Sequence, residues 1–380
     1  MTDRQLKKVA EKPKLGKKAL NFLITDKTRR KLKRRIKDRA RTKDSARTKM
    51  IRQVSHPGES HLEDILHICL KHITPLTTPL ALISQVPYSG GSLLSRLFDG
   101  HSQIHAYPGA LIPGNTAKNY WPQIDLTHRP EDWLKIISNH FDLKTFREGF
   151  KPDEKGSPRI PHIFLPALQE RIFLIYLASP ATIKTRDVFD AWMTACFGAW
   201  LNYQNHRHDK KFVTALAPGL AMQSENLANF FEIYPEGRFI ELVREPAQWF
   251  VAVSGHEPKT YGDTEWAIKR WKENVRAVME TRKKFDDRIC FIKFESLIDH
   301  TESVMSHLAE FLGISYEDIL LEPTFNGIPI QPACSQKTDN SDAKLQSFTE
   351  SKTLDESQRV LIEKMTVADY QSALQHVVAF

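Results

Sequence analysis

Short unbroken apolar runs alternate along most of the chain with longer segments in which apolar residues recur at helical spacing. Four of the short runs are typical of strands that are buried on both faces, namely 80–83, 212–217, 238–243 and 288–294. Between them, 188–200 and 271–279 repeat apolar residues every three or four positions, as helices that pack on a core do. Strands that alternate with helices predict an α/β fold whose mostly parallel sheet is flanked by helices.

Three other segments complete the expected organisation. Residues 53–74 are expected to form a helical lead-in, and a closing helix is expected from about 354 to 380. Residues 115–185 are weakly patterned and rich in proline and aromatic residues, which is typical of an insertion. In this insertion, Tyr120, Trp121 and Trp133 could either stack on a sugar ring or pack in a core.

Residues 1–52 differ in charge from everything after them. They carry 21 Lys or Arg and five Asp or Glu, whereas the rest of the chain has more acidic than basic residues, so the overall charge of +8 reflects this segment. Its few apolar residues cannot form a core, which predicts a flexible basic arm at 1–52 and one domain at 53–380. A solvated tail or frayed helix is the plain interpretation of the arm. Contact with an anionic membrane surface or a nucleic acid stays open beside it.

The cysteines and the apolar stretches bear on where the protein works. The four cysteines lie far apart without the spacing of a zinc site, and the chain has no HExxH or paired-aspartate pattern, so we expect reduced thiols and no metal. No apolar stretch approaches the roughly 18 to 20 residues of a membrane span, and no apolar signal-peptide core opens the chain. We therefore expect a cytoplasmic protein, either free or peripheral to a membrane.

A loop of small residues, Tyr88-Ser89-Gly90-Gly91-Ser92, follows the first predicted strand and precedes a helical segment. The backbone N–H groups of such a loop and the start of the helix can converge on a phosphate. Taken alone, the loop is equally compatible with an ordinary glycine turn. No Gly-Lys-Ser/Thr follows it, which argues against a nucleoside-triphosphate site.

A second candidate phosphate contact follows the third predicted strand, in Arg244-Glu245-Pro246. The planar guanidinium of Arg244 can hold a phosphate through two parallel hydrogen bonds, whereas an ion pair with a surface carboxylate is the plain alternative. Ligands of parallel sheets bind beyond the carboxyl ends of the strands. The loops at 87–92 and 244–254 are both expected there.

Together these segments resemble those of PAPS-dependent sulfotransferases, in particular bacterial-type members (PAPS, 3'-phosphoadenosine 5'-phosphosulfate). Residues 89–102 resemble their 5'-phosphosulfate loop with the helix after it, and 242–246 resemble their 3'-phosphate strand. Further similar segments are 291–297, 309–314, 323–329 and the closing helix. The resemblance runs from about 78 to 380 and leaves the arm outside.

This resemblance implies a P-loop-like three-layer sandwich and an enzyme that moves a sulfuryl group from PAPS to a hydroxyl or amine and releases 3'-phosphoadenosine 5'-phosphate (PAP). The acceptor is expected to be a small molecule or carbohydrate-like, bound in a cleft walled by the insertion at 115–185. The residues that the resemblance places around PAPS are Tyr88, Ser89, Gly90, Gly91 and Ser92 at the 5'-phosphosulfate and Arg244 at the 3'-phosphate.

Three positions depart from the family pattern. Tyr88 stands where relatives carry the Arg or Lys that steadies the bridging oxygen, and a neutral phenol supplies no charge there. Ala252 stands where they carry a serine for the 3'-phosphate, and Ser254 lies about 200° further round a helix, which leaves it a weak substitute. Pro108-Gly109-Ala110 stands where many relatives place a carboxylate or His as general base.

Two residues are candidates for the missing catalytic groups. His105 is the nearest titratable candidate for the general base, although a structural His is the plain alternative, and Lys337 is a candidate for the missing cation. Two hypotheses therefore stay open, namely an active sulfotransferase and a noncatalytic member that binds a nucleotide or a partner. A third, nucleic-acid binding through the arm, can accompany either.

Overall fold

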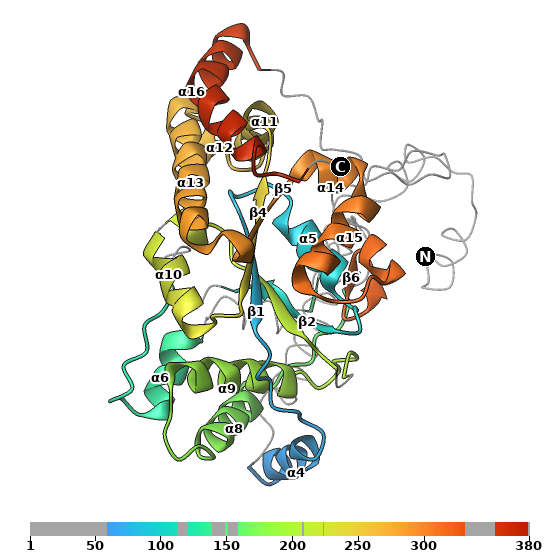
Figure 1. Cartoon of the computed structure of the whole chain (residues 1–380). Helices are drawn as coiled ribbons and strands as arrows, with labels where there is room; N and C mark the ends of the chain where they lie inside the picture. The colour runs from blue at the N-terminus through green and yellow to red at the C-terminus, as the bar shows by residue number, and fades with distance from the viewer. Residues whose placement is uncertain are drawn as a thin grey trace, which may run out of the picture. The chain divides into compact units, whose positions relative to one another are not determined.

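Five parallel strands form the central sheet, in the order β2-β3-β1-β4-β5 (Figure 1). They are β1 (Leu80–Gln85), β2 (Ile104–Ala110), β3 (Phe212–Leu216), β4 (Arg238–Val243) and β5 (Ile289–Lys293). A two-stranded antiparallel hairpin, β6 (Thr324–Phe325) and β7 (Ile328–Pro329), lies outside this sheet. The predicted parallel sheet and its four predicted strands are confirmed.

Strand β2 was not among the four predicted strands, and its sequence explains why. It lies at one edge of the sheet and contains Pro108 and Gly109, so it lacks the apolar run of a central strand. Its register against β3 shifts between Ala106 and Ala110. Proline is tolerated at such an edge because a missing N–H interrupts no inner ladder.

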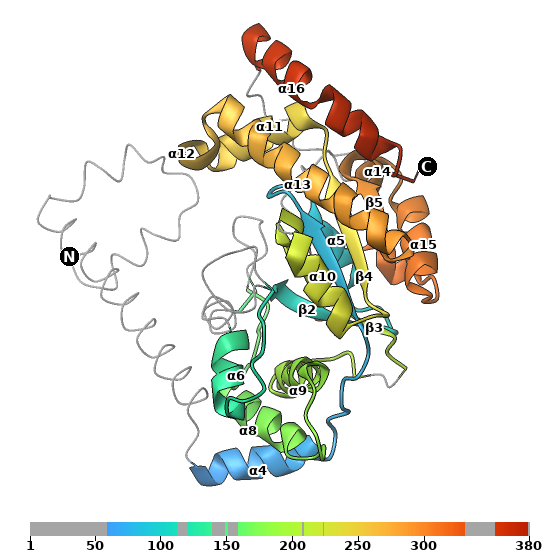
Figure 2. The same ribbon diagram turned by 60° about the vertical axis from the view of Figure 1, so that its left-hand side comes forward.

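Helices cover both faces of the sheet and make three layers. Leu80 and Leu82 of β1 join one core cluster, which α9, α10 and α13 also line, whereas Ala81 and Ile83 point into a second cluster with α5, α14 and α15. Figures 1 and 2 show α10 and α13 on one face, and Figure 1 shows α5, α14 and α15 on the other. The predicted sandwich is thus confirmed by the alternation of side chains along a strand that is buried on both faces.

The computed structural model describes residues 59–111, 121–138, 149–150, 159–206, 209–222, 224–330 and 354–378. The described elements all belong to one unit, 58–380. Its α-helices are α4 (Glu59–Leu70), α5 (Gly91–Phe98), α6 (Pro130–Ile137), α8 (Pro166–Leu177), α9 (Thr185–Gly198), α10 (Ser224–Ile233), α11 (Pro246–His256), α12 (Pro258–Tyr261), α13 (Thr264–Phe285), α14 (Phe294–Asp299), α15 (Thr301–Leu312) and α16 (Glu356–Leu374). The basic arm and Lys337 lie outside the described residues.

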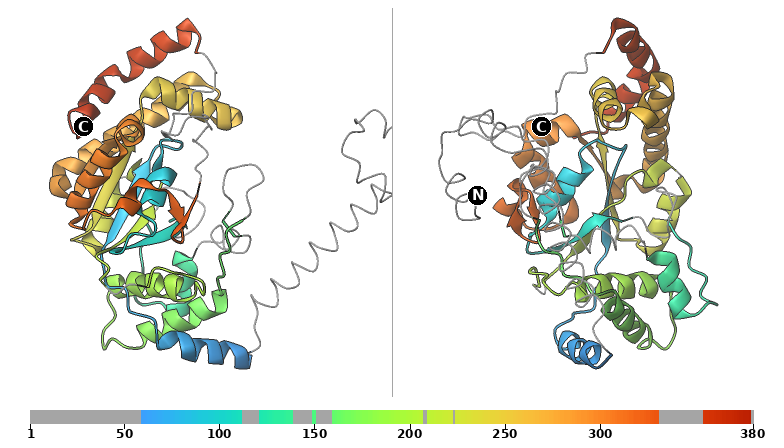
Figure 3. Two further views of the ribbon diagram at one scale, coloured as in Figure 1. Left: turned by 90° about the vertical axis from the view of Figure 1, so that its right-hand side faces the viewer. Right: turned by 180° about the vertical axis from the view of Figure 1, so that it is seen from behind.

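The predicted insertion is described in part, and it contains α6 and α8. Trp121 and Trp133 are buried in the core, with Trp121 stacked on Phe189 at a centroid distance of 5.0 Å, so these two rings pack rather than line a surface. Helices α6 and α8 lie toward the amino ends of the strands, as Figures 1 and 3 show. Tyr120 lies outside the described residues, and the predicted cleft wall stays a prediction.

Two further findings concern thiols and membranes. Cys69, Cys196 and Cys290 are free thiols, and burial raises the pKa of Cys290 to about 12. In the part of the chain that the structure describes, no helix combines the length and the apolar character needed to cross a membrane.

Candidate functional site

The glycine loop connects β1 to α5 at the carboxyl edge of the sheet, and close packing explains both glycines. Gly90 lies in the left-handed region with φ of 93°, and a Cβ there would come within 2.3 Å of the Phe294 ring. A Cβ on Gly91 would approach Leu216 at 2.8 Å and Gln85 at 2.9 Å. The chain thus passes too close to β3 and to the start of α14 for a side chain at either position.

The loop presents several polar groups to a ligand. Helix α5 begins without a side-chain cap and without an acidic residue in its first turn, so its first N–H groups favour an anion. Ser92 is exposed in that first turn. The Ser89 hydroxyl is buried and finds no hydrogen-bonding partner among the described residues. An unsatisfied buried hydroxyl costs about 1 to 3 kcal/mol, and a phosphate oxygen would satisfy it. The loop therefore fits an anion.

Gln85, the last residue of β1, braces the loop from within. Its Oε1 accepts hydrogen bonds from the N–H groups of Ser89 at 3.1 Å and Gly91 at 2.6 Å. Sequence reasoning missed this residue, although a polar side chain at the end of an apolar strand was the available signal. Two of the loop's N–H donors are thus satisfied by the protein itself.

Arg244 lies beside the loop, so the structure brings the two predicted phosphate segments together. Its Nη1 donates to the Tyr88 carbonyl at 3.0 Å, and its guanidinium carbon lies 4.5 Å from the centre of the Phe294 ring. The same ring closes off the space next to Gly90. Arg244 is 4 % exposed, so its charge lies in a medium that screens it less than water does.

Two carboxylates near Arg244 order the start of α11. Glu245 caps the helix by accepting from the N–H groups of Ala247 at 3.0 Å and Gln248 at 2.7 Å. Its own N–H donates to Glu295 Oε1 at 3.1 Å. Burial raises the pKa of Glu295 above its ordinary value, while Arg244 and Lys293 act in the opposite direction.

Tyr88, the position that departs from the family pattern, has a left-handed backbone and two side-chain contacts. Its φ is 66°, its phenol donates to Glu257 Oε1 at 2.7 Å, and its ring is stacked on that of His256 at a centroid distance of 5.0 Å. Burial and the bond to Glu257 raise the pKa of Tyr88 to about 12, so the phenol stays protonated. The loop is also held by Trp249, whose Nε1 donates to the Pro87 carbonyl at 2.7 Å. Sequence reasoning missed Glu257 and His256, and no local pattern marks them.

The structure does not bring His105 to this loop. His105 pairs with Val213, which pairs with Leu80 at the amino end of β1, so it lies roughly 15 Å from the carboxyl edge at about 3.3 Å per residue. It is buried, and its Nδ1 lies 2.7 Å from the Tyr203 hydroxyl. Burial, with smaller contributions from Lys210 and His206, lowers the pKa of His105 to about 3. These properties match the structural alternative.

The other predicted positions can be placed as follows. Ser254 is buried, and its hydroxyl donates to the Val251 carbonyl at 3.4 Å within α11. Ala252 is half-buried on the same helix. Ala110 pairs with Leu216, which borders Gly91, so the family's position for the base lies near the loop but carries no titratable group.

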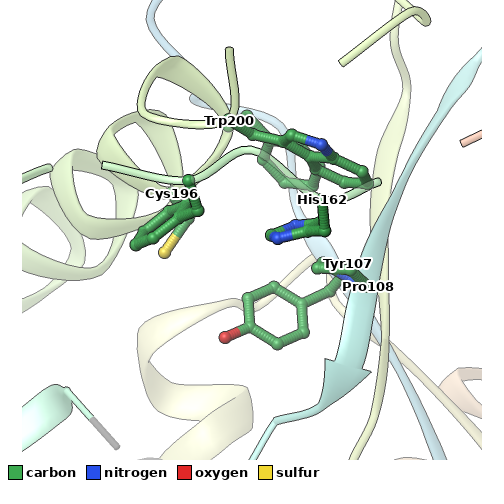
Figure 4. Close-up of a pocket in the computed structure, with 7 residues that line it drawn as sticks. Tyr107, Pro108, His162, Cys196 and Trp200 are labelled. Carbon is green, nitrogen blue, oxygen red and sulfur yellow. The ribbon is translucent and has the colours of Figure 1, made fainter. Parts of the chain in front are cut away.

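A small pocket lies away from this loop, near the C-terminal end of α9 (Figure 4). Its lining residues are Tyr107, Pro108, His162, Phe164, Cys196, Phe197 and Trp200. The His162 ring packs 4.4 Å from that of Trp200, and the lining is mainly aromatic. Neither Arg244 nor residues 88–92 line this pocket, which separates it from the candidate site.

One comparison with known proteins, a match to a family model, shows the family. A model described as the sulfotransferase family matches residues 79–318. Similar solved structures include the sulfotransferase domain from the curacin biosynthetic pathway, at 17% identity and a TM-score of 0.43 over 76% of this chain and 98% of that one. The sulfotransferase from Alicyclobacillus acidocaldarius shows 14% identity and a TM-score of 0.41 over 79% of this chain and 97% of that one. Mouse sulfotransferase SULT7A1, complexed with PAP, shows 11% identity and a TM-score of 0.38 over 81% of this chain and 89% of that one. Among curated proteins, no sequence matches this chain.

Proposed function

Because this chain belongs to the sulfotransferase family, we propose that it transfers a sulfuryl group from PAPS to a hydroxyl or amine of a small-molecule or carbohydrate-like acceptor and releases PAP. The observation that carries most weight is the hydrogen bond between Arg244 and the Tyr88 carbonyl, at 3.0 Å. It sets a buried guanidinium next to a loop that fits an anion. A donor whose ribose carries a 3'-phosphate and a 5'-phosphosulfate needs two such neighbouring groups.

The 5'-phosphosulfate would bind to the loop. Residues Ser89 to Ser92 would surround it, with the N–H groups of Gly90 and Ser92 and the hydroxyls of Ser89 and Ser92 as donors, because Gln85 already accepts from the N–H groups of Ser89 and Gly91. The unpartnered Ser89 hydroxyl and the uncapped start of α5 support this assignment. Tyr88 would contribute a neutral side chain there. Arg244 would bind the 3'-phosphate, and Ser254 is a weaker candidate for the same phosphate because its hydroxyl is used within α11. We expect the enzyme to work in the cytoplasm without a metal.

Catalysis would come mainly from positioning and from stabilising the charge that develops on the departing phosphate. Tyr88 supplies no positive charge for this, so we retain Lys337 as the candidate cation. Lys337→Ala should then lower PAPS turnover by roughly a hundredfold or more while PAP affinity is kept. Unchanged turnover in that variant would remove Lys337 from the proposal.

A noncatalytic member of the family is the second candidate, and the contact between Tyr88 and Glu257 favours it because a carboxylate lies where relatives need a cation. Calorimetric titration with PAP tests the binding site that both candidates share. Release of PAP from PAPS, followed by chromatography with and without acceptors, then separates them. A protein that binds PAP but never turns over PAPS is a binding protein.

A further inference from the structure

We propose that Glu241 makes nucleotide binding depend on a proton, because its buried carboxyl must stay neutral for the anionic donor or PAP to bind tightly. Glu241 belongs to β4 and precedes Arg244 by three residues. The inference rests on the proposed binding of PAPS and PAP. It adds a control by pH that neither phosphate segment predicts by itself.

The place of Glu241 in the fold is the first argument. It is fully buried, and it pairs in register with Ser84 of β1, so two polar residues are neighbours on adjacent inner strands. Asn274 of α13 reaches the same place and donates through Nδ2 to Glu241 Oε1 at 2.6 Å. Polar side chains from two strands and one helix thus meet within an otherwise apolar core.

The hydrogen bonds of this cluster favour a neutral carboxyl. Glu241 Oε2 and Asn274 Oδ1 are both buried, and neither has a hydrogen-bonding partner among the described residues. A protonated Oε2 can donate to Oδ1 while Oε1 accepts from Nδ2, whereas a carboxylate has no proton to donate. The neutral acid can therefore pair with the amide through both of its oxygens, and the carboxylate cannot.

The surroundings of Glu241 supply no charge that would offset its burial. Burial raises its pKa to about 8, and the uncharged Ser84 and Asn274 are the described residues that act in the opposite direction. Its register partner in β5 is the apolar Phe291. The charged residues of α13 around Asn274 are engaged elsewhere, namely Lys272 and Arg276 with Asp369 and Arg270 with Glu273.

The distance from Glu241 to the candidate site makes the coupling electrostatic. Three residues of β-strand separate it from Arg244, which is roughly 10 Å at about 3.3 Å per residue. At that distance and an effective dielectric constant of about 20, a carboxylate and one negative charge on the nucleotide repel each other enough to change affinity by roughly tenfold. By reciprocity, a bound nucleotide strengthens proton binding at Glu241 by the same factor.

Direct contacts connect the same cluster to the site. Ser84 is followed in β1 by Gln85, which braces the glycine loop through two hydrogen bonds. Trp271, one turn before Asn274 in α13, donates through Nε1 to the Arg244 carbonyl at 3.3 Å. The residues that shape both phosphate segments are thus neighbours of the buried carboxyl, so its ionisation should disturb them as well.

The test is calorimetric titration of the full chain with PAP between pH 7 and 9, above the second ionisation of a phosphate at about pH 6. Wild-type affinity should fall about fivefold across this range. At about pH 8.5, binding should take up roughly half a proton from solvent, seen when the heat changes with the ionisation enthalpy of the buffer.

Glu241→Gln keeps a neutral side chain of similar shape that can still bond to Asn274. Its PAP affinity should match that of wild type at pH 7 within about twofold, stay constant to pH 9, and involve no proton uptake. Glu273→Gln removes an exposed carboxylate of α13 and should keep the wild-type pH dependence. If Glu295→Gln abolishes the pH dependence and Glu241→Gln does not, the proton lies on Glu295 and the proposal is wrong.

Wild type alone decides the matter if Glu241→Gln does not fold. A constant PAP affinity from pH 7 to 9 without proton uptake would overturn the role of Glu241, although the proposed function would stand. Absence of PAP binding at pH 7 would instead remove the proposed function, and this inference with it.

Discussion

Arg244 donates a hydrogen bond to the carbonyl oxygen of Tyr88 at 3.0 Å, across 156 positions of the sequence. The contact joins the end of β4 to the loop after β1, and these strands are neighbours in the sheet. One side chain therefore both holds the backbone of the loop and places a positive charge beside it. Its removal should affect ligand affinity and local order together.

Arg244→Ala should weaken PAP binding by about 2 kcal/mol or more, or roughly thirtyfold, because a charged hydrogen-bonded contact to phosphate is lost. Arg171→Ala is the matched control, since Arg171 of α8 forms an exposed ion pair with Glu63 of α4 and has no part in the candidate site. Calorimetric titration measures both. Equal affinity in the Arg244 variant and wild type would remove the 3'-phosphate assignment.

Gly90→Ala should destabilise the protein by about 1 to 3 kcal/mol, because alanine is strained at φ of 93° and its Cβ would collide with the Phe294 ring. Gly255→Ala is a suitable control, since a Cβ there meets nothing within 4 Å. Denaturant unfolding followed by circular dichroism compares them. If both variants unfold at the wild-type midpoint, the close packing against Phe294 is not tight in solution.

Glu241 should make stability fall as pH rises. It is fully buried in β4, its Oε1 accepts from Asn274 Nδ2 at 2.6 Å, and burial raises its pKa to about 8. The folded state therefore holds a proton that the unfolded state releases between about pH 4.5 and 8, so this group opposes folding progressively across that window. Glu241→Gln should reduce this loss of stability with rising pH.

Thermal unfolding at pH 5 and pH 8 reads out this difference. The variant should gain stability relative to wild type at pH 8 and gain little at pH 5. A wild type that is equally stable at both values, with the variant unchanged, would show that water or a rearrangement solvates the carboxylate.

Deletion of residues 1–52 should leave both the fold and PAP affinity intact, because the described core begins after the arm. Salt-sensitive binding to duplex DNA or to anionic vesicles, if present in the full chain, should disappear with it. Unfolding of the truncated chain, or loss of PAP binding, would instead make the arm part of the domain.

The local sequence pattern predicted the strands and the loop because each of them is formed by a short continuous stretch of the chain. The run at 80–83 is apolar on both faces, and the small residues at 88–92 follow it directly. Strand β2 was missed because an edge position allowed Pro108 and Gly109 into it. The sequence could not show that Glu257 contacts Tyr88, since this contact spans 169 positions and depends on where α11 ends.

His105 shows that nearness in sequence can also mislead. Its distance along the chain from the loop is short, and a titratable ring there was a reasonable candidate for a base. The chain, however, runs along α5 away from the loop before it enters β2. His105, near the start of β2, therefore lies at the amino ends of the strands, on the opposite side of the sheet from the loop. Only the direction of the strands decides which residues meet.

The bonds from Gln85 to the N–H groups of Ser89 and Gly91 have a consequence for binding kinetics and entropy. A loop that is already shaped by its own strand has little conformational freedom left to lose when an anion arrives. Association should then be governed by diffusion and charge rather than by a slow ordering step, and the heat of binding should carry little contribution from loop folding.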